Sequence, residues 1–124
     1  MLATEHVQLA RKFLIDADRE LEAGDHFQAS EKLWGAASHM VIAEMHRRDL
    51  KQSGHRAMID AIEQFAEDCE EPSLSTNFAI AESLHANFYH GFMQPQDVRR
   101  HRGRVHEFVE RMDDLSDGRI VAGN

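Results

Sequence analysis

The sequence predicts an all-α fold, an antiparallel bundle of four to five helices. Residues that favour helix, such as Ala, Glu, Leu, Arg and Met, are plentiful, whereas β-branched residues are scarce. Only two prolines and seven glycines occur in the 124 residues. Apolar residues recur at spacings of three and four along most of the chain, which is the repeat of one helical face.

The first helix is expected from about Ala3 to Ala23. Gly24 is a typical C-terminal stop, and Asp25 is a suitable N-cap for the helix that follows. One face of this helix carries the apolar row Val7, Ala10, Leu14, Ala17 and Leu21.

The second helix is expected from about His26 to Arg48. Its apolar residues cover much of the helix circumference, which is typical of a helix at the centre of a bundle. The small residues Gly35, Ala36 and Ala37 allow a neighbouring helix to approach closely. This circumference is wider than one small bundle needs, so it also favours pairing with a second copy of the chain.

Three further helices are expected, at about 55–68, 75–90 and 95–115. Pro72 separates the first two because it disfavours helical geometry in the residue before it. Pro95 suits the first turn of the last helix. The chain is therefore expected to form one domain over 1–124, with its core at about 3–115 and a short tail at 116–124.

Composition restricts the environment and the partners of the domain. Cys69 is the only cysteine, so no internal disulfide can form, and no apolar stretch has the length of a signal peptide or a membrane span. These features predict a cytoplasmic protein that does not contact membrane. The net charge of −8 argues against broad, non-specific binding of nucleic acid.

Three segments carry a family resemblance. The run 21–37 has a Gly-Asp turn, then Gln-Ala-Ser-Glu-Lys, an aromatic residue (Trp34) and an Ala pair. His55 opens the third helix, and 84–89 reads Leu-His-Ala-Asn-Phe-Tyr. Together they resemble the PaREP family of archaeal proteins, within the HEPN (higher eukaryote and prokaryote nucleotide-binding) helical superfamily. The resemblance implies a homodimer that binds nucleotide or RNA, or docks a partner protein of nucleotidyltransferase type.

The basic residues Arg99, Arg100, Arg102 and Arg104 concentrate in the last helix. Ribonucleases of the superfamily carry an Arg followed, after four to six residues, by a His, and Arg100 and His106 match that pattern. The resemblance implies an alternative function, a metal-independent endoribonuclease. His106 would then handle the proton, and Arg100 would stabilise charge on the phosphorane.

The same segment has a second interpretation that needs no catalysis. At about 100° per residue, Arg99, Arg102 and His106 share one helix face. With His101 they form a candidate phosphate-binding surface. Alternatively, the segment is an ion-pair face for acidic residues of the chain, where each pair contributes under about 1 kcal/mol.

The fourth helix supplies the remaining candidates. His85, Asn87 and Tyr89 are candidate ligand-binding residues near Trp34. Glu82 and His85, three apart on a helix, together with His39, are weak candidates for a metal- or small-molecule-binding bundle, a second alternative function. Only one such Glu-x-x-His pair occurs, so no bound metal or other cofactor is expected. Whether the protein is an enzyme stays open.

Overall fold

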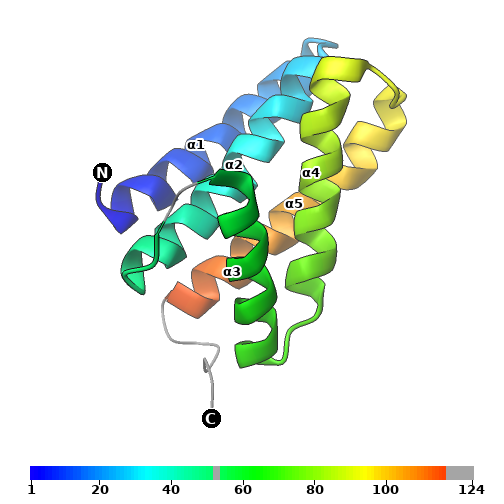
Figure 1. Cartoon of the computed structure of the whole chain (residues 1–124). Helices are drawn as coiled ribbons and strands as arrows, with labels where there is room; N and C mark the ends of the chain where they lie inside the picture. The colour runs from blue at the N-terminus through cyan, green and yellow to red at the C-terminus, as the bar shows by residue number, and fades with distance from the viewer. Residues whose placement is uncertain (52–53, 117–124) are drawn as a thin grey trace.

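The computed structural model describes residues 1–51 and 54–116. Within these residues the chain forms α-helices joined by short connections, with no strand. The helices are α1 (Ala3–Glu22), α2 (His26–Arg47), α3 (Gly54–Cys69), α4 (Ser73–His90) and α5 (Pro95–Ser116). The all-α bundle is therefore confirmed (Figure 1). The predicted tail beyond Ser116 lies outside the described residues.

Helix ends follow the predicted signals closely. Gly24 adopts a positive φ of 83°, and the Asp25 side chain accepts a hydrogen bond from the Gln28 backbone N–H at 3.0 Å. With Asp25 as its N-cap, α2 begins at His26, as expected. α4 starts earlier than predicted, at Ser73, because Pro72 itself has helical backbone angles and serves as the N-cap.

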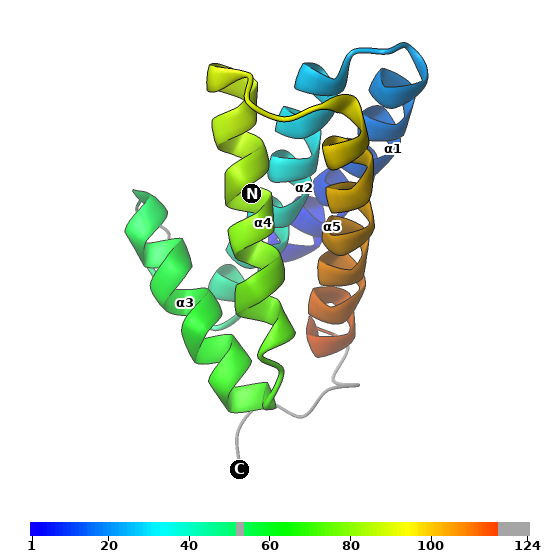
Figure 2. The ribbon, with the colours of Figure 1, turned by 90° about the vertical axis from the view of Figure 1, so that its right-hand side faces the viewer.

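α2 occupies the centre of the bundle and contacts all four other helices. α1 lies along α2 in antiparallel orientation, whereas α3 packs on the opposite side, against α4 and α2 (Figures 1 and 2). Gly35 permits the close approach of α1, because a Cβ atom there would lie 3.0 Å from the Phe13 ring. The wide apolar surface of α2 is thus buried within one chain and does not itself require a second copy.

The core between α2, α4 and α5 is apolar and well filled. Phe78 of α4 and Phe108 of α5 are buried against each other with ring centroids 5.9 Å apart. Phe65 of α3 is equally buried and closes the end of the bundle where α2 and α3 meet. Among the helices that the structure describes, none is long and apolar enough to span a membrane.

One carboxylate is fully buried in this end of the bundle. Glu44 accepts hydrogen bonds from Arg47 Nε at 2.9 Å and from Arg48 Nε at 2.7 Å. Arg48 also pairs with Asp68 of α3 at 3.1 Å, and its guanidinium lies over the Phe65 ring. The network joins α2 to α3 through a fully buried carboxylate and partly buried partners.

Candidate functional site

A groove runs between α1 and α5, which lie antiparallel and contact each other less than any other pair of touching helices. Because their contact is sparse, hollows open along the groove. Three hollows lie one after another along the groove, and each is lined mainly by residues of these two helices.

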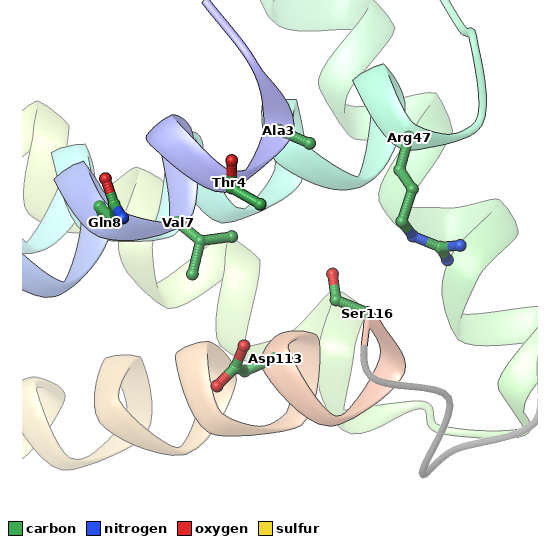
Figure 3. A pocket seen from close by; sticks show the side chains of 7 residues that line it. All are labelled: Ala3, Thr4, Val7, Gln8, Arg47, Asp113 and Ser116. Carbon is green, nitrogen blue, oxygen red and sulfur yellow. The ribbon is translucent and has the colours of Figure 1, made fainter.

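The first hollow lies where α1 begins and α5 ends (Figure 3). Its volume is about 340 Å³. Val7 of α1 faces Asp113 of α5 across it, and Arg47 of α2 stands at one end (Figure 3). Arg47 and Asp113 are already ion-paired, with Glu44 and Arg11 respectively. This hollow is therefore polar at its rim, but its charges are compensated within the chain.

The middle hollow, of about 330 Å³, combines apolar and titratable residues. Leu14, Ile15 and Val109 line it together with His106. The Nε2 atom of His106 is buried and makes no hydrogen bond within the described chain. Burial lowers the pKa of His106 below its ordinary value, and nearby Arg102 lowers it further. The imidazole is therefore held neutral, and its buried Nε2 atom is left without a hydrogen-bond partner in the wall of the hollow.

The third hollow has a volume of about 400 Å³ and is the most strongly charged. Arg102 donates two hydrogen bonds to the Asp18 carboxylate, at 2.5 and 3.0 Å, and these hold the pKa of Asp18 below its ordinary value. Arg99 lines the same hollow with no ion pair among the described residues. A fixed guanidinium beside an available one is an arrangement suited to phosphate oxygens.

Arg100 lies on another face of α5. Its guanidinium is largely exposed and donates to Asp97 at 2.9 Å. A separation of six residues places Arg100 and His106 about 120° apart around the helix. Within one chain the structure therefore does not bring the two proposed catalytic residues together. His101 is half-buried, and burial, followed by the charge of Arg100, lowers its pKa.

A second cluster joins α2, α3 and α4 around Trp34. His55 and His85 both stack on the indole, with ring centroids 5.2 and 5.1 Å away. Each imidazole also contacts a carboxylate: His55 pairs with Glu82 at 2.6 Å, and His85 pairs with Glu31 at 2.8 Å. The cluster assembles four of the positions that carry the sequence resemblance, Glu31, Trp34, His55 and His85.

This cluster was only partly visible in the sequence. Glu82 and His85 lie three apart on α4, and Glu31 and Trp34 lie three apart on α2, so each pair shares a helix face. The role of His55 could not be read from such a spacing, because it depends on how α3 packs.

The other candidates of α4 occupy different environments. Asn87 is fully buried: its Nδ2 donates to Ser30 Oγ at 3.0 Å, and its Oδ1 accepts from the Met93 backbone N–H at 2.7 Å. Tyr89 is exposed and meets the His85 ring edge-on. Asn87 therefore connects α2, α4 and the start of the α4–α5 connection, whereas Tyr89 faces solvent.

The weak metal candidates are not assembled into one site. His39 contacts His6 of α1, whereas Glu82 and His85 belong to the Trp34 cluster. Across residues 1–51 and 54–116, no three His, Cys, Asp or Glu side chains are grouped to hold a metal ion.

Comparison with known proteins identifies one family. The model of the archaeal PaREP1/PaREP8 family matches residues 5–109, which include all of α2, α3 and α4. No curated protein and no solved structure matches the chain.

Proposed function

The chain belongs to the archaeal PaREP1/PaREP8 family, and we propose that it is a binding module whose α1–α5 groove receives a phosphate-bearing ligand, a nucleotide or a short RNA segment. The third hollow supplies the observation that carries the proposal. Arg99 has no ion pair there, and it stands beside an Arg102 that Asp18 holds in place.

The neighbouring hollow extends the site along α5. Arg102 and His106 are one helical turn apart, so a ligand held at the arginines reaches the apolar walls formed by Leu14 and Val109. His106 lines the same hollow and adds a neutral polar side chain to these walls. A charged end and an apolar, hydrogen-bonding end are what a nucleotide presents.

The charge of the protein limits the size of the ligand. The chain carries a net charge of −8, and Asp18 and Glu22 stand in the same hollow as the two arginines. A long nucleic acid would meet repulsion over most of this surface. The proposal therefore concerns one or a few phosphates, and it assigns no catalytic step to the site.

Replacing Arg99 with alanine is expected to weaken binding by about tenfold or more, because a hydrogen bond to a charged group contributes about 1.5–3 kcal/mol. Binding of ATP and of a short, labelled single-stranded RNA is measured at low and at physiological salt. Affinity should fall as salt rises.

Arg100→Ala is the matched control, because Arg100 is the next residue but lies on another face, paired with Asp97. It should bind like wild type. If wild type cleaves RNA, and Arg100→Ala and His106→Ala each abolish that cleavage, the ribonuclease alternative replaces the proposal. If wild type binds neither probe at low salt, phosphate binding is wrong and docking of a partner protein, such as a nucleotidyltransferase-type subunit, becomes the better interpretation.

We also infer that two copies associate through the outer face of α1. Ile15 is 55% exposed at the middle of this face, with Arg11 and Asp18 one turn away on either side. In an antiparallel pair of α1 helices, the two Ile15 side chains would meet at the centre, while Arg11 and Asp18 keep their ion pairs with Asp113 and Arg102 of the same chain. Such a pair would also cover the open side of the groove.

Ile15→Glu should therefore convert a dimer to a monomer, because it places a charge at the centre of the contact. Sedimentation equilibrium of wild type should give about twice the 14.2 kDa of one chain. Leu50→Glu is the control, since Leu50 is also exposed but lies after α2 and lines none of the three hollows. A monomeric wild type, or a dimeric Ile15→Glu variant, contradicts this contact.

A further inference from the structure

Two histidines join the first half of α1 to α2. The Nδ1 atoms of His6 and His39 lie 2.9 Å apart, and the two rings stack with centroids separated by 5.1 Å. His6 is only 9% exposed, and the Phe13 ring covers His39 from the side of α1. The pair is thus an interhelical contact in which His6 is buried and His39 is partly buried.

The contact depends on how many protons the pair carries. With both rings neutral, one Nδ1 bears a hydrogen and donates it to the bare Nδ1 of the other. One added proton preserves this arrangement, because a charged ring still donates to a neutral one. A second added proton leaves two N–H groups facing each other and two positive charges in contact, so the hydrogen bond is lost.

The charged groups around the pair mostly oppose its protonation. The α-amino group of Met1 and the His46 side chain of α2 oppose positive charge on His6, and Glu5 of α1 favours it. Burial is the main cause that lowers the pKa of both His6 and His39, and for His39 the second cause is His6 itself. The unfolded chain therefore binds more protons than the folded one. Stability is lost as the pH falls from about 6.5, the ordinary His value, through the lowered pKa values.

We propose that the His6–His39 pair is a proton-operated latch. The pair holds the first half of α1 on α2 while it carries at most one added proton, and it releases that half when both rings are protonated. The released half, Ala3–Leu14, includes the residues of α1 that line the hollow in Figure 3. Acidification therefore alters one wall of the groove. Only the consequence for a bound ligand rests on the proposed function; the latch itself does not.

An NMR titration of the histidine ring resonances tests the latch in the unmodified protein. His6 and His39 should titrate as a coupled pair, in two separate steps that both rings report. The second step should lie below about 6.5, the ordinary His value. Two independent, single-step titrations near the ordinary His value would overturn the proposal.

Amide hydrogen exchange tests the release. Relative to the intrinsic rates, protection of residues 3–14 should fall between about pH 7.5 and pH 5, while protection of α4 stays constant. The double variant His6→Gln/His39→Gln should lose this pH dependence, and His90→Gln should keep it. If the double variant keeps it, other groups drive the release and the latch is wrong. If the double variant does not fold, the titration of the wild type decides.

Discussion

Replacing Glu44 with alanine is expected to destabilise the protein by about 3–5 kcal/mol, the cost of removing one partner from a buried ion pair. Glu44 is fully buried and accepts hydrogen bonds from the Nε atoms of Arg47 and Arg48. Its removal leaves Arg48, which is mostly buried, with Asp68 as its only carboxylate partner among the described residues. Ser116, at the end of α5, also loses its acceptor. Three helices are therefore weakened by one change.

Chemical denaturation near pH 7 measures this effect. Asp60→Ala is the control, because Asp60 also pairs with an arginine, Arg56, but both side chains are largely exposed. That change should alter the free energy of unfolding by less than about 1 kcal/mol. If Glu44→Ala has an effect as small as Asp60→Ala, the buried network does not hold the helices together as described.

The positions of the helices could be predicted because local signals determine them. The Gly24-Asp25 turn separates α1 from α2, and Pro95 opens α5, as their residue types indicate. The burial of Glu44 could not be predicted, because a glutamate in a helix is usually exposed. It depends on Arg48 reaching Asp68, twenty residues along the chain, and on the way that α3 packs.

Parts of the candidate site could likewise be predicted from the sequence, and other parts could not. Helix periodicity correctly placed Arg99, Arg102 and His106 on one face of α5, and that face lines two adjacent hollows. The partner of Arg102 could not be predicted, because Asp18 lies 84 residues away. The sequence motif joined Arg100 to His106, although a separation of six residues places the two side chains about 120° apart around α5. The likeness to the HEPN superfamily, on which that motif depends, stays a prediction.

Asn87→Ala is expected to destabilise the protein by about 2–3 kcal/mol. Asn87 is fully buried, and both groups of its amide are bonded, to Ser30 Oγ and to the Met93 backbone N–H. Without its side chain, the Met93 N–H becomes a buried donor with no partner, which costs about 1–3 kcal/mol, and the cavity adds to that loss. The α4–α5 connection should become less protected from hydrogen exchange.

Asn77 provides a matched control on the same helix. It is also buried, but neither polar atom of its amide has a hydrogen-bond partner among the described residues. Asn77→Ala removes the same atoms and leaves a similar cavity, while it relieves two unsatisfied groups. It should therefore cost clearly less than Asn87→Ala, and the difference measures the two hydrogen bonds of Asn87.

ATP binding by folded Asn87→Ala should equal that of wild type, because Asn87 lies outside the residues that line the α1–α5 groove. If the two variants are equally destabilised, Asn87 does not hold the connection through its hydrogen bonds. If Asn87→Ala instead weakens ATP binding without loss of stability, Asn87 is a ligand-binding residue.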